Sequence, residues 1–288
     1  MKRILAGAIS LCLTAAVLAG CAAKGFDSKK NIHAVTREPG SGTRGAFTEL
    51  FGLEEKQADG SKKDLIIKEA GVENNTNTIL TTVQNDLYSI SYCSMGSLND
   101  NIKALQIEGI SATTDNVKNG TYPIKRPFVI ATKGAPEGLA KDFFDYIMSG
   151  DGQAVVEKAG YIAIDGTAAA YAGTKPEGKL VIGGSSSVSP LMEKLIEGYK
   201  ALNSAADIQL QTSDSSIGMT KTIEGAYDIG MASRELKDEE KAELTDAQIA
   251  LDGIAVIVNK ENTLTDIAKD DVKKIYLGET KTWDGVGK

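Results

Sequence analysis

The chain has 288 residues, of which 42% are apolar and 25% are charged, enough for one or two globular domains with their own cores. Its formal net charge of −7 argues against a nucleic-acid partner. An anionic ligand would have to be attracted by local dipoles and one or two cations. One histidine and three cysteines are too few for a zinc site, and no calcium loop is visible, so we expect no metal and no cofactor.

The N-terminus has the shape of an export signal, because Lys2 and Arg3 precede an apolar run at 4–18. The run ends Leu-Ala-Gly-Cys at 18–21, which resembles the bacterial lipobox. We therefore expect 1–20 to be a signal peptide, Cys21 to be acylated, and 21–30 to tether the protein to the outer face of a bacterial membrane. A plain secretory signal with a chance cysteine is the alternative.

Elsewhere in the chain, strand-like and helix-like patterns alternate, which favours an α/β architecture. Cys93 lies in one apolar run and is expected to be a buried side chain rather than a nucleophile. A linker-like stretch at 165–179 divides the chain into two comparable parts. The expected strands are 32–36, 88–92, 128–132, 180–182, 208–211 and 254–258, and the expected helices are 43–52, 139–149, 190–203, 216–225 and 269–277.

Three Gly- and hydroxyl-rich turns run directly into predicted helices, at 37–44, 183–190 and 212–219. Each would expose backbone N–H donors at a positive helix end and add Ser or Thr hydroxyls. Taken singly, such residues are more often plain helix caps. Three turns in one chain, with Arg37 beside the first, predict a shared oxyanion site, because a guanidinium matches a tetrahedral oxyanion bidentately.

An enzyme is not indicated by the same residues. The single histidine, His33, lies at a probable strand start beside the tether, and no Gly-x-Ser-x-Gly elbow surrounds the serines. The stretch 173–179 has the glycines and lysine of a P-loop, but Leu180 stands where Ser or Thr is required. We therefore expect a binding protein that performs no chemistry.

Six segments together resemble signatures of the phosphate-binding subunit of the bacterial phosphate ABC transporter. They are Arg-Glu-Pro-Gly-Ser-Gly-Thr-Arg at 37–44, Gly-Ser-Ser-Ser-Val-Ser-Pro at 184–190, Asp-Ile-Gly-Met-Ala-Ser-Arg-Glu at 228–235, and the segments 90–97, 126–134 and 252–259. In that family the Gly-Ser-Ser segment opens the mature chain, whereas here the Arg-Glu segment does. We read a circular permutation, with 163–179 joining the old ends; the alternative is a truncated tandem pair.

The resemblance implies a two-lobed, type II periplasmic-binding-protein fold that closes about a hinge of two crossing strands. The crossing strands match 126–132 and 253–258. One lobe is expected to be contiguous, at 127–252, and the other to combine 30–125 with 253–288. The resemblance also implies a monomer that delivers inorganic phosphate to the permease subunits of an ABC transporter; sulfate, molybdate or a phosphate-sensing role remain alternatives.

The family's ligand contacts fall on eight positions of this sequence. Arg37 is the cation, and the other positions are Ser41, Gly42, Thr43, Ser186, Ser187, Ser215 and Ser233. Some relatives carry an aspartate at the last position, which accepts the proton of hydrogen phosphate and rejects sulfate. A serine can accept that bond but rejects sulfate less severely. Glu38 or Asp214 could replace the acceptor or be a helix-start acid, and Arg234 could be a second cation or a salt-bridged surface residue.

Overall fold

The computed structural model describes residues 25–57 and 62–287, so Cys21 and the expected signal peptide lie outside the described residues. The helices are α1 (Gly42–Leu50), α2 (Thr76–Asn85), α3 (Thr114–Lys118), α4 (Gly138–Met148), α5 (Gly150–Lys158), α6 (Ser189–Leu202), α7 (Ser215–Ile223), α8 (Asp238–Lys241) and α9 (Lys269–Tyr276). The strands are β1 (His33–Arg37), β2 (Glu54–Lys56), β3 (Lys62–Asp64), β4 (Gly71–Glu73), β5 (Ser89–Ser94), β6 (Ile102–Ala104), β7 (Gln106–Ile107), β8 (Lys125–Thr132), β9 (Gly178–Ser185), β10 (Ala206–Ser213), β11 (Ile229–Ala232), β12 (Thr245–Asn259) and β13 (Asp266–Ile267).

The alternation of strands and helices predicted from the sequence is confirmed. All five expected helices are present within one or two residues of their predicted ends, as α1, α4, α6, α7 and α9. Four of the described helices were missed, namely α2, α5 and the short helices α3 and α8, of five and four residues. The segment that forms α2 is mostly Thr and Asn, with only two apolar residues, Ile79 and Val83, on its buried face. The segment that forms α5 follows α4 almost without interruption and carries two glycines.

One sheet runs through the whole molecule, with the strand order β10-β9-β11-β8-β12-β5-β1-β4. The predicted strand 254–258 is only part of a longer strand. In the structure it belongs to β12, which is continuous over 15 residues. The first part of β12 pairs with β8, and the second part pairs with β5 and β6. Its polar first residues do not look like a strand in the sequence, since their extended conformation depends on the neighbouring strand β8.

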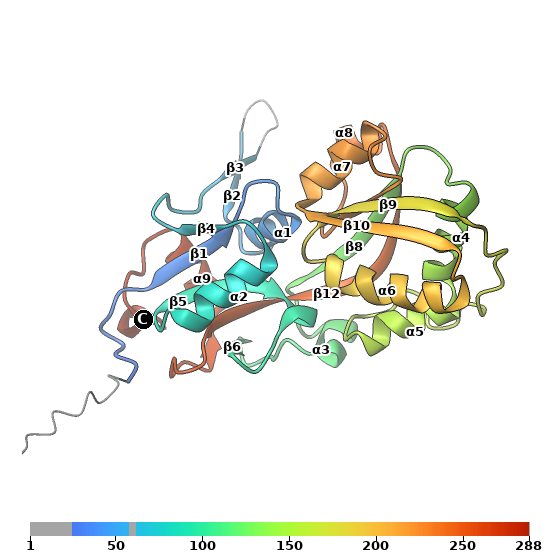
Figure 1. The fold of residues 1–288 in the computed structure, drawn as a ribbon. Helices are drawn as coiled ribbons and strands as arrows, with labels where there is room; N and C mark the ends of the chain where they lie inside the picture. Colours follow the sequence, from blue (N-terminus) through green and yellow to red (C-terminus); the bar gives the residue numbers. More distant parts are fainter. Residues whose placement is uncertain (1–24, 58–61, 288) are drawn as a thin grey trace, which may run out of the picture.

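Two lobes are visible on either side of the molecule, joined by β8 and β12 (Figure 1). The main core of one lobe contains only residues between Phe128 and Ala250, and we call this the central lobe. The main core of the other lobe contains residues from 34–124 and 254–283, together with Ile162, and we call this the terminal lobe. Each lobe also has a smaller core on the opposite face of the sheet. This division agrees with the two-lobed fold.

Both ends of the described chain lie in the terminal lobe, where they pair with each other. The Ile32 amide donates to the Lys281 carbonyl over 2.8 Å, and the Asp284 amide donates to the Ser28 carbonyl over 2.7 Å. The segment between α5 and β9, residues 163–177, contains no helix or strand. It is held to the central lobe by Asp142, whose carboxylate accepts from the Thr174 amide and from the Tyr171 hydroxyl. Among the described residues, no helix combines the length and apolarity needed to cross a membrane.

Candidate functional site

Four helices begin at the boundary between the two lobes, and side chains from their first turns contact one another. The starts of α1 and α2 belong to the terminal lobe, and those of α6 and α7 belong to the central lobe. The Thr43 hydroxyl of α1 lies 2.7 Å from the Ser187 hydroxyl, which precedes α6. The Thr76 hydroxyl of α2 lies 3.3 Å from the same Ser187 oxygen. The N–H donors of these helix starts are therefore aimed at a common region.

Arg37 ends β1 and points into this region, where it is 2% exposed. Its Nε and Nη2 each donate to one Glu38 carboxylate oxygen over 2.7 Å. The same guanidinium also donates to the Ser186 hydroxyl of the central lobe over 3.0 Å and to the Thr76 hydroxyl over 3.3 Å. Arg37 is thus a fixed cation that contacts both lobes, with its position set by a bidentate ion pair.

The start of α1 is shaped by Ser41 and two glycines. The Ser41 hydroxyl caps the helix by accepting from the Arg44 amide. Gly40 has a φ of +96°, which favours glycine. A Cβ on Gly42 would lie 2.5 Å from the Ser215 hydroxyl and 2.7 Å from the Ser233 hydroxyl. Only glycine therefore lets the start of α1 approach the central lobe this closely.

Ser186 and Ser187 lie in the tight turn between β9 and α6. The Ser186 amide donates to the Ser213 carbonyl, and the Ser187 amide donates to the Ser185 hydroxyl. The turn depends on Gly184, whose Cβ would lie 2.4 Å from the Met231 carbonyl oxygen. Pro190 in the first turn of α6 fixes the helical direction.

Ser215 and Ser233 complete the central-lobe side of the site. Ser215 is the first residue of α7, and its hydroxyl accepts from the Ser233 amide over 3.2 Å. The Ser233 hydroxyl accepts from the Ser185 hydroxyl over 3.0 Å. Both serines are completely buried.

The structure brings all eight positions predicted from the sequence to this boundary, and all eight residues are buried. It also adds residues that were not predicted. Thr76 could have been suspected, because Asn75 before it is a capping residue that starts a fourth hydroxyl-bearing helix. Ser185 lies in the predicted turn 183–190 but was not named as a contact, whereas Arg126 and Asp252 carry no comparable local signal, because their partners are distant in the chain.

Arg126 and Asp252 form a second ion pair directly behind the predicted contacts. They face each other across β8 and β12, with Arg126 Nη2 3.1 Å from an Asp252 carboxylate oxygen. The guanidinium also donates to the Thr43 hydroxyl over 2.6 Å and to the Ser233 carbonyl over 3.2 Å. Burial raises the pKa of Asp252 to about 6, although Arg126 and the Ser94 hydroxyl oppose this shift.

Glu38, Asp214 and Arg234, for which the sequence left two possible roles each, have defined hydrogen-bond partners in the structure. Glu38 is paired with Arg37, at the edge of the site. Asp214 caps α7 by accepting from the Ile217 amide over 2.8 Å, as expected of a helix-start acid. Arg234 forms a bidentate pair with Glu240, at 2.7 and 2.8 Å, so of its two alternatives the structure favours the salt bridge.

Groups that could perform covalent or metal chemistry are not assembled at this boundary. His33 lies at the surface and pairs with Asp86. Cys93 is buried, as predicted, and burial raises the pKa of its thiol to about 12. Within residues 25–57 and 62–287, no group of three potential metal ligands lies together.

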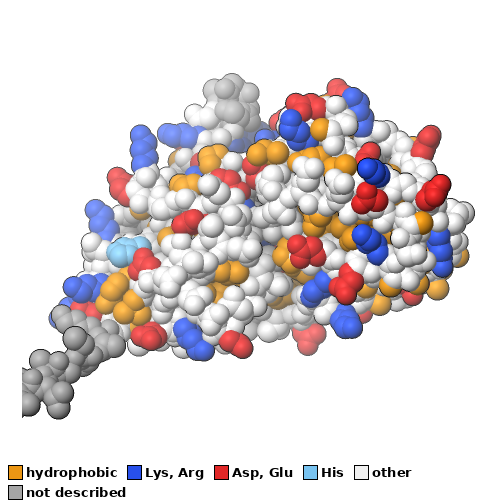
Figure 2. Space-filling view, viewed as in Figure 1, with side chains coloured by type: hydrophobic (Ala, Val, Ile, Leu, Met, Phe, Trp, Pro, Cys, Tyr) orange, Lys and Arg blue, Asp and Glu red, His pale blue; other side chains and the backbone are white. Residues whose placement is uncertain are grey.

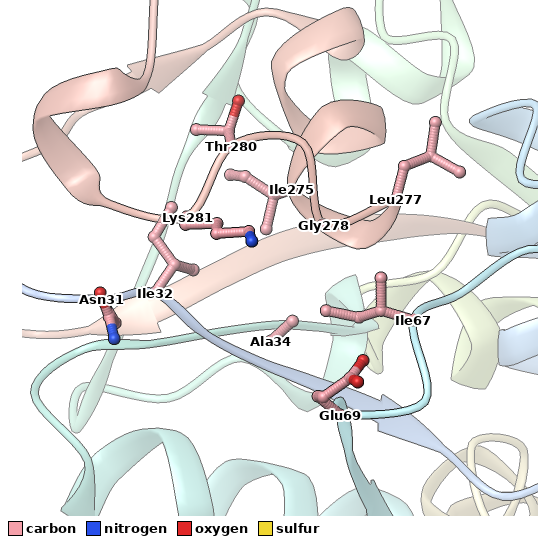
Figure 3. Close-up of a pocket in the computed structure, with 10 residues that line it drawn as sticks. All are labelled: Asn31, Ile32, Ala34, Ile67, Glu69, Ile275, Leu277, Gly278, Thr280 and Lys281. Atoms are coloured by element: carbon pink, nitrogen blue, oxygen red, sulfur yellow. The ribbon is translucent and has the colours of Figure 1, made fainter.

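A hollow of about 450 Å³ lies elsewhere, beside the chain ends of the terminal lobe (Figure 3). Its wall is mixed: Ile32, Ala34, Ile67, Ile275 and Leu277 are aliphatic, and Asn31, Glu69, Thr280 and Lys281 are polar. None of the eight predicted contacts lines it. Because its lining contains no arginine and no helix start, it differs from the oxyanion site predicted from the sequence.

Charged side chains on the face shown in Figure 2 do not mark the site either. On the face shown in Figure 2, acidic and basic side chains are interspersed rather than separated by sign. Attraction of an anion by this acidic chain would therefore depend on the buried arginines and helix starts at the lobe boundary.

Comparison with known proteins gives a consistent result. Residues 2–151 and 169–287 match the family described as the PBP superfamily domain. The phosphate-binding protein PstS 2 of Streptococcus agalactiae is 49% identical over 284 residues, which cover 98% of this chain and 97% of that relative. By contrast, the phosphate-binding protein PstS of Bacillus subtilis is 37% identical over 116 residues, or 39% of each chain.

A solved structure shares the fold. The crystal structure of a phosphate-binding protein of a phosphate ABC transporter from Streptococcus pneumoniae TIGR4 is 42% identical and has a TM-score of 0.71. The match covers 89% of this chain and 99% of the other. The chain therefore belongs to the PBP superfamily and, within it, to the family of PstS phosphate-binding proteins.

Proposed function

We propose that this protein captures inorganic phosphate between its two lobes and delivers it to the permease of an ABC transporter, without performing chemistry on it. One observation carries the proposal. A buried arginine, Arg37, donates to hydroxyls at the starts of α2 and α6, at the boundary between the lobes where the starts of α1 and α7 also lie. The names of the relatives, which are phosphate-binding proteins, support the same ligand.

The physical basis is a dense set of donors that is already positioned. A tetrahedral dianion offers many acceptor positions and gains from guanidinium, hydroxyl and backbone N–H donors at once. Arg37, Ser41, Gly42 and Thr43 would contact it from the terminal lobe. Ser186, Ser187, Ser215 and Ser233 would contact it from the central lobe. Burial in a region of low dielectric strengthens each of these bonds.

The anion would also hold the lobes together, because its donors come from both of them. We place the lobes at about 30–125 with 253–288, and at 127–252. The bonds that now cross the boundary, such as Arg37 to Ser186, join groups that an anion would bridge instead. A ligand that bridges two lobes shifts the equilibrium toward the closed state by its differential affinity.

Calorimetric titration of the purified protein with phosphate tests the assignment directly. We expect saturable binding of inorganic phosphate at one site per chain and no binding of a phosphate monoester, whose organic group would not fit between closely packed helix starts. We expect light scattering to report a monomer. Absence of phosphate binding would contradict the proposal.

Two glycines on the same helix offer a matched test of lobe closure. Gly42→Ala would push a methyl group against Ser215 and Ser233, whereas at Gly45 the new Cβ would lie 3.9 Å from the Arg234 side chain. Overpacking of this kind costs about 1–3 kcal/mol, or roughly 5- to 150-fold in affinity. We expect Gly42→Ala to weaken phosphate binding by that amount and Gly45→Ala to leave it unchanged. Equal effects would argue against closure on the ligand.

We further propose that Cys21 is lipidated and anchors the protein at the outer face of the cell membrane. The support is the charged start, the apolar run and the Leu-Ala-Gly-Cys ending of residues 1–21. In a bacterial host, the natural chain should sediment with membranes and incorporate labelled palmitate. The Cys21→Ser variant should lose the label, and retention of the label would contradict the proposal.

We also propose that the chain order is a circular permutation of the order found in other members. The support is that a PstS 2 relative aligns over nearly the whole chain, whereas the Bacillus subtilis PstS aligns over 39% of it. The paired chain ends in the terminal lobe would be the new termini. The segment 163–177, which has no helix or strand, would join the former termini. A chain that is opened within 166–170 and joined from 287 to 25 should fold and bind phosphate with the same affinity.

A further inference from the structure

Five hydroxyls at the lobe boundary share a directional feature, because each of them accepts a hydrogen bond from an N–H group of the protein. The Thr43 hydroxyl accepts from Arg126, and the Thr76 and Ser186 hydroxyls accept from Arg37. The Ser41 and Ser215 hydroxyls accept from backbone amides. A hydroxyl keeps its one hydrogen when it accepts, so these particular bonds do not use that hydrogen.

Ser233 ends the longest such chain of bonds. The Ser187 amide donates to the Ser185 hydroxyl over 3.3 Å, and the Ser185 hydroxyl donates to the Ser233 hydroxyl over 3.0 Å. The backbone N–H can only donate, which fixes the direction of the first bond, and in the second bond Ser185 is the donor and Ser233 the acceptor. Hydrogen bonds in such a chain polarise one another and strengthen the last donor.

The hydrogen of the Ser233 hydroxyl has no acceptor among the described residues, because none of their hydrogen bonds has this hydroxyl as its donor. The side chain is completely buried, so bulk water does not take the hydrogen. The start of α1 at Gly42 packs directly against this oxygen. An unsatisfied buried donor at this position favours a ligand that brings an acceptor oxygen.

The carboxylates near the site are committed to other partners. Both oxygens of Glu38 accept from Arg37, and both oxygens of Asp252 accept, one from Ser94 and one from Arg126. Asp214 caps α7. Among the described residues, none of these three carboxylates is hydrogen-bonded to a hydroxyl of the eight predicted contacts, so none is placed against Ser233 to accept a ligand proton there.

We propose that this is a donor-only site in which the Ser233 hydroxyl donates to an unprotonated oxygen of the anion, so that the protein also binds sulfate. This inference rests on the proposed function and makes it more specific, because it concerns the same site. The site selects a tetrahedral dianion by its charge and size. It does not require a hydrogen on the ligand, which is the property that separates hydrogen phosphate from sulfate.

Separate titrations of the natural protein with inorganic phosphate and sulfate, at a pH where phosphate is a dianion, test the proposal. A site with a dedicated buried partner for one ligand group rejects a ligand that lacks it by about 10⁴- to 10⁵-fold, and a site without such a partner by about 10²-fold. We expect sulfate to bind less than about 10³-fold more weakly than phosphate. A larger ratio would overturn the inference while leaving phosphate capture intact. Failure of both anions to bind would instead contradict the proposed function.

The Ser233→Ala variant tests whether the Ser233 hydroxyl donates a hydrogen bond to the anion or accepts one from it. Loss of a donor should weaken phosphate and sulfate by a similar factor of about 10 to 100. Loss of an acceptor for the ligand proton would weaken phosphate alone, and that result, or no change for either anion, would overturn the inference. Ser189→Ala is the matched control, since Ser189 is a buried serine of the same region whose hydroxyl contacts Ser185 and Thr212 instead. If Ser233→Ala failed to fold, the ratio of phosphate affinity to sulfate affinity in the natural protein would still test the inference.

Discussion

The two arginine–carboxylate pairs of the lobe boundary differ in what their guanidinium groups contact. Arg37 pairs with the adjacent residue Glu38 and directs its other bonds to Thr76 and Ser186, which are themselves at the proposed ligand position. Arg126 pairs with Asp252 on the neighbouring strand and reaches Thr43 and the Ser233 carbonyl from behind. One arginine would contact the ligand, and the other positions residues that do.

The two pairs also differ in how they are built. The Arg37 pair forms within one turn of chain, so its geometry is largely local. The Arg126 pair joins residues 126 positions apart and exists only because β8 and β12 run side by side. A buried pair of the second kind costs desolvation on both partners, which is visible in the raised pKa of Asp252. Variants of the two pairs should therefore affect binding and stability differently.

The largest effect is expected from Arg37→Ala, which removes the cation and leaves Glu38 without its partner. Truncating one member of a buried charged pair costs 2–5 kcal/mol or more, so phosphate affinity should fall by about 10³-fold. Arg37→Lys should recover part of this loss, because it restores the charge without the planar fork. Calorimetry gives both values, and unchanged affinity in the alanine variant would place the ligand elsewhere.

Asp252→Asn should change the pH dependence of stability. The native carboxyl has a pKa of about 6, whereas the unfolded one titrates near its ordinary value. As the pH falls through about 6, the native state takes up a proton before the unfolded state does, which stabilises it; this contribution is lost as the pH rises above about 6.

The difference in unfolding free energy between the natural protein and Asp252→Asn should consequently be larger by about 2 kcal/mol at about pH 4.5 than at about pH 7. Urea unfolding at the two pH values measures it. Parallel pH profiles for the two proteins would show that Asp252 titrates normally and that burial does not raise its pKa.

Thr43→Val removes a hydroxyl that contacts both Arg126 and, across the lobe boundary, Ser187. The variant loses the bonds to Arg126 and Ser187, so phosphate affinity should fall by about tenfold or somewhat more. Thr48→Val is the matched control, because Thr48 is buried in the same helix but bonds to Gly45 and Glu54, within the terminal lobe. Calorimetric titration should show a selective loss at Thr43, and equal losses would indicate a general effect on α1.

The smallest effect on binding is expected from Arg234→Ala. This arginine neighbours Ser233 in the sequence, but its side chain is paired with Glu240. Phosphate affinity should stay within about twofold, although the partly buried pair should contribute to thermal stability. A tenfold loss of affinity by calorimetry would show that Arg234 acts as a second cation for the ligand.

Local patterns were sufficient to predict much of the fold and most of the candidate site. Glycine and serine before an amphipathic run specify a helix start with free N–H donors, and this chemistry is contained within a few neighbouring residues. Five helices, the alternation of strands and helices, and the three turns at 37–44, 183–190 and 212–219 with Arg37 could be predicted for that reason, whereas the individual contacts, Ser233 among them, followed from the family resemblance. The segment of α2 was missed because its polar residues carry little helical periodicity.

The sequence alone determined the helix-start turns, the presence of Arg37 beside one of them, and the family resemblance. Only the tertiary structure decided which groups lie opposite each other across the lobe boundary. Arg126 contacts Thr43 across 83 positions of chain, and the extended first half of β12 depends on its pairing with β8. The direction of each hydroxyl is likewise set by neighbours from distant segments, because a hydroxyl can donate or accept and only its surroundings choose between the two.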